Sequence, residues 1–256
     1  MEATEHARLP SLQQRRLRNR QEVIDAILAA AREIMRRDGV AALNLHEVAR
    51  LVGMQTPSLY KYFPSKFALY DALFRMGVRL FREQDQEIWN GTPPGWERIQ
   101  AWFEARLALA EQHPDLYRLA VDPTSVPGFV PSEEGRQETR QLVVAARQAI
   151  KEVIEAGVMA PPMPLDQVVD LLLATRRGII AEHLGKQLVF EAGEEERFRR
   201  LIPRALTLLK AAWSPSQQPF LEMMNSRHSQ SAPGDGLDPS VAADARDEGT
   251  GMEPAR

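Results

Sequence analysis

The sequence predicts an all-α protein, and three observations support the prediction. Apolar residues recur at the three-to-four-residue spacing of amphipathic helices in almost every periodic segment. No convincing run of alternating apolar and polar residues, the pattern of a half-buried strand, is present in the sequence. The 256 residues are 44% hydrophobic and 26% charged, close to globular averages of roughly 45–50% and 25%. The chain is therefore long enough to bury a core, in about one or two domains.

The expected helices follow one another between glycine and proline breaks. The first carries an apolar stripe from Val23 to Met35 and stops at Gly39, because glycine tolerates the left-handed conformation of a helix end. Further apolar stripes run through 67–81, 96–107, 142–154, 165–189 and 194–213. Glycines and prolines separate them at 91–95, 122–131 and 160–164. We expect about nine helices in total.

Two short helices joined by a tight turn are predicted within residues 43–66. Asn44 is the N-cap candidate of the first, with a glutamate three residues later as in a capping box, and Gly53 ends it. Thr56 then caps a second helix that has a proline at its first position. Pro64 requires this second helix to end before it. A helix, a short glycine-bearing turn and another helix form the helix-turn-helix arrangement.

The second helix divides its side chains between two faces. Leu59 and Phe63 lie one turn apart and are expected to point into the core, as are Phe67 and Phe74. The remaining hydroxyl, cationic and phenolic groups then face outward, and such groups bind the phosphates and base edges of DNA. The expected DNA contacts are Asn44, Thr56, Pro57, Ser58, Tyr60, Lys61, Tyr62 and Lys66, with Arg18 and Arg20 before the first helix. The alternative is a compact three-helix hairpin whose aromatic residues serve only as core.

The charge of the chain is divided between its two ends. The net charge is -3, yet the first 66 residues hold 11 Lys and Arg against 7 Asp and Glu, and residues 214–256 hold 3 against 7. A basic N-terminal part indicates a polyanionic partner. Residues 1–19 are expected to form a basic flexible arm that either contacts phosphates or the minor groove or is simply solvated. Residues 214–256 are rich in proline and contain one aromatic residue, which predicts a disordered acidic tail.

Residues 20–74 resemble the N-terminal domain of the TetR family of transcriptional repressors. The likeness lies in the first helix ending RDGV, in the second-helix pattern LxxVAxxxGM, and in TPSLYKYFPSK followed by ALYDALF. Two features depart from the family pattern. Tyr62 replaces a common histidine, and Gln55-Thr56-Pro57 replaces a commoner Ser-Lys-Gly-type entry to the recognition helix. The resemblance therefore implies DNA binding but no particular operator sequence.

The resemblance implies a homodimeric DNA-binding transcriptional regulator. Its three-helix head would span 20–66, and its helical ligand-binding and dimerisation domain would span 67–213. Two recognition helices would read a palindromic operator in double-stranded DNA, and a small-molecule inducer would shift the population toward a conformation that releases DNA. The dimer interface would use helices at about 165–189 and 194–213. A transcriptional activator or a ligand-independent member is the near alternative, and a helical interaction module or small enzyme without DNA binding is a more distant one.

The regulatory half offers candidates for an inducer pocket. A short stretch within 113–131 resembles a C-terminal domain found in many actinobacterial-type members of the family. This resemblance does not indicate which ligand the domain binds. The candidates are large or polar groups on otherwise apolar helix faces, for each of which a structural role is the favoured interpretation: Trp102, Phe103, Arg106, Tyr117, Phe129, Ile154, Met159, Arg176 and His183. Arg176 and His183 share one helix face. A buried Arg176 needs an anionic partner, either a ligand acid or a carboxylate such as Asp170 or Glu182, and pairing at the dimer interface is equally open.

Enzyme chemistry finds little support in the sequence. Cysteine is absent, which excludes disulfides, thiolate zinc sites and cysteine nucleophiles. The five histidines lack metal-binding spacing, and neither a glycine-rich phosphate loop nor a GxSxG motif is present. We expect no catalytic site, no metal and no cofactor. The absence of a signal-peptide pattern and of any stretch approaching about 18 apolar residues predicts a cytoplasmic protein without a membrane partner.

Overall fold

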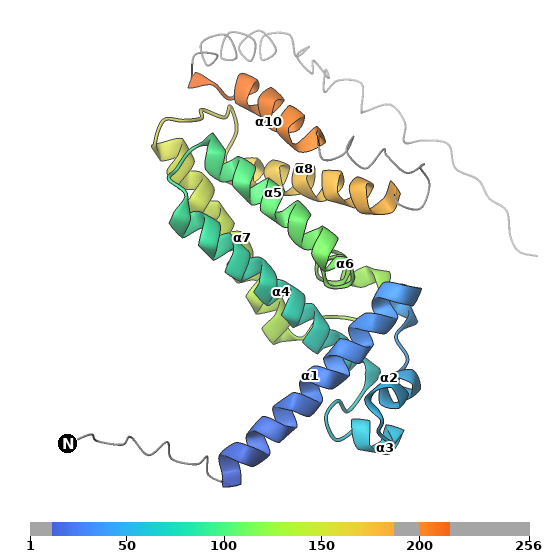
Figure 1. The fold of residues 1–256 in the computed structure, drawn as a ribbon. Helices are drawn as coiled ribbons and strands as arrows, with labels where there is room; N and C mark the ends of the chain where they lie inside the picture. Colours follow the sequence, from blue (N-terminus) through green and yellow to red (C-terminus); the bar gives the residue numbers. More distant parts are fainter. Residues whose placement is uncertain (1–11, 187–199, 216–256) are drawn as a thin grey trace, which may run out of the picture. The chain divides into compact units, whose positions relative to one another are not determined.

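The computed structural model describes residues 12–186 and 200–215, and within these ranges it contains nine α-helices and no strand (Figure 1). The prediction of an all-α fold is confirmed. The helices are α1 (Leu12–Asp38), α2 (Leu45–Val52), α3 (Thr56–Leu59), α4 (Lys66–Gly91), α5 (Trp96–Gln112), α6 (Pro114–Val121), α7 (Glu133–Glu155), α8 (Leu165–Lys186) and α10 (Leu201–Ala212). Two 3-10 turns, η1 (Val40–Ala42) and η2 (Pro123–Ser125), connect them. The expected acidic tail, from residue 216 onward, lies outside the described residues, as do residues 1–11 of the expected arm.

The first helix starts earlier than the sequence analysis expects. Residues 12–19, assigned there to a flexible arm, form the first two turns of α1. Leucine, glutamine and arginine are strong helix formers, so the helix extends upstream of its apolar stripe without needing that stripe for support. Its other end agrees with expectation. Gly39 has a φ of 95°, and its N–H donates to the carbonyl of Met35 over 3.0 Å.

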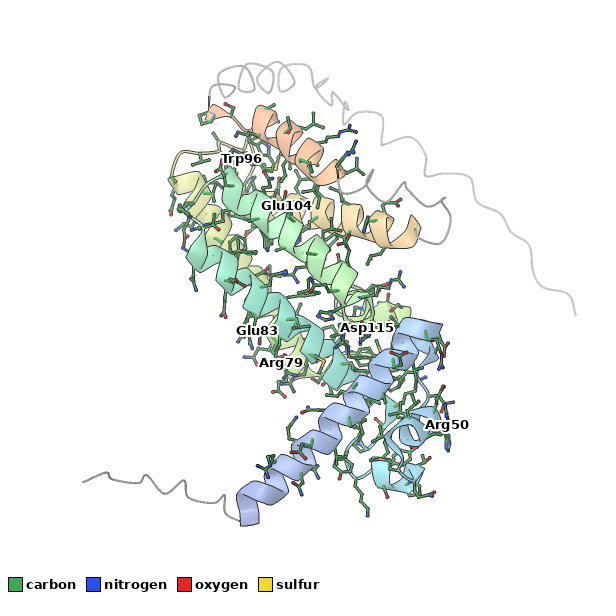
Figure 2. All side chains as sticks on the ribbon, viewed as in Figure 1. Arg50, Arg79, Glu83, Trp96, Glu104 and Asp115 are labelled. Atoms are coloured by element: carbon green, nitrogen blue, oxygen red, sulfur yellow. The ribbon has the colours of Figure 1, made fainter. Side chains whose placement is uncertain are left out.

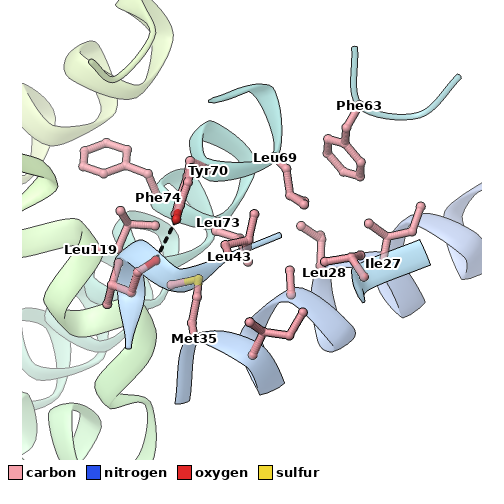
Figure 3. Close-up of a cluster of buried hydrophobic side chains, with 14 of the residues drawn as sticks. Ile27, Leu28, Met35, Leu43, Phe63, Leu69, Tyr70, Leu73, Phe74 and Leu119 are labelled. Carbon is pink, nitrogen blue, oxygen red and sulfur yellow. Dashed lines mark hydrogen bonds between the residues drawn. The ribbon is translucent and has the colours of Figure 1, made fainter. Parts of the chain in front are cut away.

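The buried apolar side chains form two cores, and α4 contributes residues to both. The first core joins α1, α2 and α3 to the first half of α4 and to α6, with Ile27, Leu73 and Leu119 fully buried (Figure 3). The second core joins the second half of α4 to α5, α7, α8 and α10, and contains Trp102 and Leu172. Any shift of α4 therefore acts on both cores at once, because packed interiors transmit displacement.

One expected core aromatic lies at the surface. Phe74 is buried as expected, whereas Phe67 is 45% exposed. Phe67 lies in the first turn of α4 and packs against Phe129 of the loop after η2, with the two ring centroids 6.2 Å apart. Gly128 in that loop also lies beside the ring, because a Cβ at this position would lie 3.5 Å from Cζ of Phe67. The helical period alone does not reveal this exposure.

A buried ionic cluster ties α1 to α6. The Asp115 carboxylate is fully buried and accepts a hydrogen bond from Nε of Arg32 over 2.8 Å. Nε of Arg36 lies 3.5 Å from the same carboxylate, and Nη2 of Arg32 lies 3.0 Å from Nδ1 of His113. Burial and the neighbouring Arg32 lower the pKa of His113, so the neutral ring accepts from Arg32 at pH 7. Figure 2 labels Asp115 where α6 approaches α1.

None of the helices in the described ranges is long and apolar enough to cross a membrane.

The Asp115 cluster generates a stability prediction. Asp115→Asn removes the carboxylate and leaves Arg32 and Arg36 facing a neutral amide. We expect the free energy of unfolding to fall by about 2 kcal/mol, less than the roughly 3–5 kcal/mol of a fully buried pair because both arginines remain partly exposed. Urea unfolding measures the change. Asp166→Asn, which breaks an exposed pair with Arg147, serves as the control and is expected to have little effect. Equal effects of the two substitutions would show that the cluster does not join the two elements.

Candidate nucleic-acid interface and internal cavity

The first helix of the pair is built from local hydrogen bonds. The Asn44 side chain accepts from the backbone N–H of His46 over 2.9 Å and so caps α2, as predicted. No capping-box bond from Glu47 is among the described contacts, and its carboxylate instead accepts from Nη2 of Arg37 over 2.7 Å. Gly53 ends the helix with a φ of 72°, a conformation that glycine adopts without steric cost.

The second helix begins one residue earlier than expected. Gln55, and not Thr56, is the N-cap of α3, because the N–H of Ser58 donates to the carbonyl of Gln55 over 2.8 Å. Thr56 and Pro57 therefore occupy the first turn. The helix proper ends at Leu59, and residues 60–62 continue as turns before Pro64. The predicted inward pair holds, since Leu59 and Phe63 are 0% and 8% exposed.

A contact between the two helices involves a residue that sequence reasoning did not select. Nδ1 of His46 on α2 lies 3.1 Å from Oγ1 of Thr56 on α3. This contact fixes the Thr56 hydroxyl at the entry of α3, beside the exposed turn. The only sequence signal for His46 is its place two residues after the cap, a position that does not by itself distinguish a functional residue. Arg50 was also missed, although its side chain is 70% exposed on the last turn of α2.

The predicted contact residues reach solvent to different degrees. Asn44, Pro57, Tyr60, Lys61, Arg18 and Arg20 are exposed, and Thr56, Ser58, Tyr62 and Lys66 are half-buried. The structure brings together residues from distant parts of the chain: the Arg20 guanidinium lies 5.1 Å from the centre of the Tyr62 ring. This cation–π contact joins the start of α1 to residues 56–63, called here the recognition segment. Arg18 lies on α1 and pairs with Glu22 at 3.6 Å.

The start of α4 adds a second polar group to this surface. Ser65 caps the helix, with its hydroxyl accepting from the N–H of Ala68 over 3.0 Å. Lys66 is the first helical residue, and its Nζ lies 5.5 Å from the centre of the Tyr70 ring. Free N–H groups and a lysine at a helix N-terminus attract phosphate oxygens. The head therefore presents hydroxyls, cations and aromatic edges on the segment from α3 to the start of α4.

The second candidate site is a cavity of about 50 Å³ between α4, α5, α6, α7 and α8. Four of the nine candidate pocket residues line it: Trp102, Arg106, Tyr117 and Arg176. Sequence reasoning missed its buried acid, Asp85. The signal for Asp85 was present, since it follows Phe81 by four residues on the buried stripe of α4, where a carboxylate is rare unless paired.

Asp85 satisfies two of the polar groups around the cavity. Its Oδ1 accepts from Nη2 of Arg106 over 2.6 Å and from Nε1 of Trp102 over 3.0 Å. The Arg106 guanidinium also lies 3.7 Å from the centre of the Phe81 ring. Burial lowers the pKa of Arg106, and the Asp85 charge partly opposes this shift.

Arg176 is left without such a partner. It is 6% exposed, its Nε and Nη1 find no hydrogen-bond acceptor, and its guanidinium stacks 3.8 Å from the centre of the Trp102 ring. Burial, and then repulsion by Arg106, lower the pKa of Arg176 to about 9. Neither of the carboxylates suggested by the sequence, Asp170 and Glu182, forms an ion pair with Arg176 among the described residues.

The other five candidates serve elsewhere in the described structure. Phe129 packs in the first core, with its ring centroid 5.6 Å from that of Tyr70. Nε2 of His183 lies 2.8 Å from a carboxylate oxygen of Glu111. The remaining three pack in or against the second core and do not line the cavity: Phe103, Ile154 and Met159. All five residues therefore lie outside the lining of this cavity.

A larger cavity of about 540 Å³ lies beside the first. Asp38 to Ala41, at the end of α1 and in η1, form one wall, and α6 with Leu184 of α8 forms the other. Tyr117 and Val121 line both cavities. No group of three or more histidine, aspartate or glutamate residues that could hold a metal ion exists within the described ranges.

Part of the chain is similar in sequence to bacterial regulatory proteins. Residues 27–73 match the family model described as bacterial regulatory proteins, tetR family. The chain is 24% identical over 105 residues to the nucleoid occlusion factor SlmA of Vibrio cholerae, covering 41% of this chain and 52% of that protein. It is 26% identical over 150 residues to the HTH-type transcriptional repressor KstR2 of Mycobacterium tuberculosis, covering 56% of this chain and 72% of that protein. The chain spans about half the length of the first curated relatives it matches.

The fold is also similar to that of a solved structure. A transcriptional regulator, FadR from Bacillus subtilis in complex with stearoyl-CoA, superimposes with a TM-score of 0.57 at 16% identity. The match covers 73% of this chain and 98% of that chain. At this identity the likeness concerns the fold.

Proposed function

We propose that the chain, whose residues 27–73 match the tetR family model, is a DNA-binding transcriptional regulator of that family. It would act as a homodimeric repressor that a small-molecule inducer releases from a palindromic operator. The observation that carries the proposal is the division of the recognition segment: Leu59 and Phe63 are buried while Tyr60 and Lys61 face solvent. We assign the head to residues 20–66 and the regulatory domain to 67–213. Because its target is DNA, we place the protein in the cytoplasm.

In the proposed complex the start of α3 enters the major groove. Thr56, Ser58 and Tyr60 offer hydroxyls to base edges and phosphates, and Lys61 adds a positive charge. Lys66 and the N-terminus of α4 contact the phosphate backbone next to the groove. Arg20, held against Tyr62 at 5.1 Å, extends the contact toward the start of α1.

The proposed dimer uses α8 and α10, within the predicted ranges 165–189 and 194–213. Leu208 on α10 is 73% exposed and Leu171 on α8 is 39% exposed. Large exposed apolar side chains on adjacent helices are typical of an interface with another subunit. A two-fold dimer would place two recognition segments about 34–36 Å apart, one helical turn of DNA.

The proposed inducer acts through helices shared by the two cores. The cavity is lined by Phe81 and Asp85 of α4 and by Tyr117 of α6, and both helices also pack against the head. A ligand that prefers one arrangement of α4 and α6 therefore shifts the position of the head, by as much as its affinities for the two arrangements differ.

Repression is the favoured direction because the relative KstR2 is named a transcriptional repressor. An activator or a ligand-independent regulator would use the same head, and a reporter assay with the operator upstream of a promoter separates these alternatives. The experiment that tests the proposal itself is selection of bound DNA from random duplexes by the full-length protein at about 100 mM salt. Recovery of one palindrome with half-sites about one helical turn apart is expected. Recovery of no sequence, or of an unpaired half-site, would contradict the proposal that a dimer binds the operator.

A first prediction concerns Lys66. Lys66→Ala should weaken binding similarly for all DNA sequences and reduce the slope of log K against log salt by about one per lost phosphate contact, hence about two per dimer. Fluorescence anisotropy on the selected operator at several salt concentrations measures both quantities. Lys151→Ala removes the same charge from α7, where Lys151 pairs with Glu155, and should leave the slope unchanged. An unaltered slope in Lys66→Ala would rule out the phosphate contact.

A second prediction concerns the dimer. Leu208→Arg places a charge in the proposed apolar interface and should yield a monomer with at least roughly tenfold weaker operator binding, because burying an unpaired charge is costly. Sedimentation measures the mass and anisotropy the affinity. Val144→Arg, on α7 at a side chain that is 66% exposed, is the matched control and should remain dimeric. A dimeric Leu208→Arg variant would exclude this face.

A further inference from the structure

We propose that the internal cavity binds a monocarboxylic acid with an apolar body, and that Arg176, with Arg106 and Tyr117, recognises the carboxylate. The inference rests on the proposed function, because it names the chemical class of the inducer. Its basis is the set of unpaired polar groups that surround the cavity.

The first observation is an unsatisfied guanidinium aimed into the cavity. Arg176 is 6% exposed, lines the cavity, and leaves Nε and Nη1 without an acceptor. A buried cation without hydrogen bonds lowers the stability of the fold. A folded chain therefore retains one chiefly where an anion binds to it and accepts its hydrogen bonds. Stacking on Trp102 at 3.8 Å holds the guanidinium in place and leaves its edges open.

Further unpaired donors lie around the same cavity. Nε of Arg106 and the hydroxyl of Tyr117 are buried without a partner. Burial raises the pKa of Tyr117, so its hydroxyl stays protonated and can donate. Three side chains from three different helices thus offer donors to one small space, and a carboxylate is acceptor-only, with about four lone-pair positions on its two oxygens.

The buried charges around the cavity favour a ligand with a single negative charge; Arg177, which also lines the cavity, is exposed and its charge is screened by solvent. The buried charged residues of the lining are Arg106, Arg176 and Asp85, and they leave one positive charge uncompensated. Asp85 is already engaged, since its Oδ1 accepts from both Arg106 and Trp102. A monocarboxylate neutralises the remaining charge, whereas a phosphate monoester, at -1.5 to -2 near pH 7, would bring roughly twice the charge that the buried groups can balance.

Within residues 12–186 and 200–215, no carboxylate supplies the missing anion. The α7 part of the lining consists of Thr139, Leu142, Val143 and Ala146 and holds no acid. Arg176 stacks on Trp102 inside its own subunit, so it does not face the surface of α8 on which a partner subunit would dock. Because Val143 and Arg177 also line the cavity and are exposed, the space reaches the surface between α7 and α8.

The size of the two cavities indicates the shape of the ligand. A volume of about 50 Å³ is a third of the roughly 150 Å³ that holds benzene in an engineered apolar cavity, so it accommodates the acid group and little more. The adjoining cavity of about 540 Å³ is lined by Val40, Val121 and Leu184, and shares Tyr117 and Val121 with the first. An apolar body that extends past these two side chains reaches the segment where α1 joins the rest of the head.

The test titrates the full-length protein with straight-chain carboxylic acids of four to ten carbons and with the primary amides of the same lengths. Isothermal titration calorimetry should detect binding of the acids, and each amide should bind at least tenfold more weakly. Affinity should rise by about fourfold per methylene, the value for complete burial, until the apolar space is filled. Failure of every acid to bind at millimolar concentration, or equal binding of acid and amide, would overturn the proposal.

Two variants assign the effect to Arg176. Arg176→Gln should weaken acid binding by roughly 10- to 100-fold, the loss expected for a hydrogen bond to a charged group. Arg140→Gln, on the exposed face of α7, should bind acids as the unmodified chain does. Without ligand, Arg176→Gln should unfold at the same or a higher temperature, because it removes an uncompensated buried charge. A clear fall in unfolding temperature, or unchanged acid affinity, would show that Arg176 is a structural residue.

Failure of the acid site and failure of the proposed function give different results. Acid binding is measured without DNA, and operator release is measured separately by adding the tightest acid to the protein bound to the selected duplex. Binding without release leaves the acid site in place and contradicts the inducer role. Operator binding with no response to any acid, together with no calorimetric signal, contradicts the acid site and leaves DNA recognition unaffected.

Discussion

The arrangement of the described chain depends on burying one continuous apolar stripe of α4. Leu69 and Leu73 near its start complete the core of the head, and Phe81 further along completes the core of the regulatory helices. The hydroxyl of Tyr70 donates to the carbonyl of Val40 over 2.7 Å, which fixes η1 against the same helix (Figure 3). Because a close-packed interior does not deform gradually, α4 cannot move in one core without repacking the other. The connection that we propose between the cavity and the head follows from this constraint.

Two buried charge clusters in the described chain differ in one respect. At Asp115 one carboxylate also faces two arginines, but Arg32 and Arg36 are 16% and 44% exposed, so water solvates the remaining positive charge and the cluster connects α1 to α6. At Asp85 one carboxylate serves Arg106 and Trp102, and Arg176 is left over. Water can satisfy the free donors of a partly exposed arginine, whereas a fully buried arginine with unpaired N–H groups is costly unless another molecule binds to them. The Asp115 cluster therefore stabilises the fold, and the Asp85 cluster is where we propose that a ligand binds.

The proposed DNA-binding surface is built mainly from contacts between residues close in sequence, whereas the cavity is not. Asn44, Gly53 and the proline that follows the recognition segment act on backbone groups a few residues away, so the sequence alone locates them. The likeness of residues 20–74 to the TetR family was confirmed by the family model matched over 27–73. The cavity draws its lining from five helices spread over about 100 residues. Only four of nine candidates, chosen as unusual residues on apolar faces, prove to line it.

The sequence by itself determined the helical class, most helix ends, the helix-turn-helix and its inward Leu59 and Phe63, because these follow from period and from hydrogen bonds between near neighbours. The tertiary structure decided which side chains have neighbours. Phe67 fits the stripe of α4 yet is 45% exposed. Asp85 lies on the same stripe and is buried, because Arg106 and Trp102 of α5 donate hydrogen bonds to it. Arg176 was suspected as a buried cation, but only the packing of α4, α5 and α8 reveals that no described carboxylate reaches it. Burial and pairing are properties of segments distant in sequence, and for that reason no local pattern encodes them.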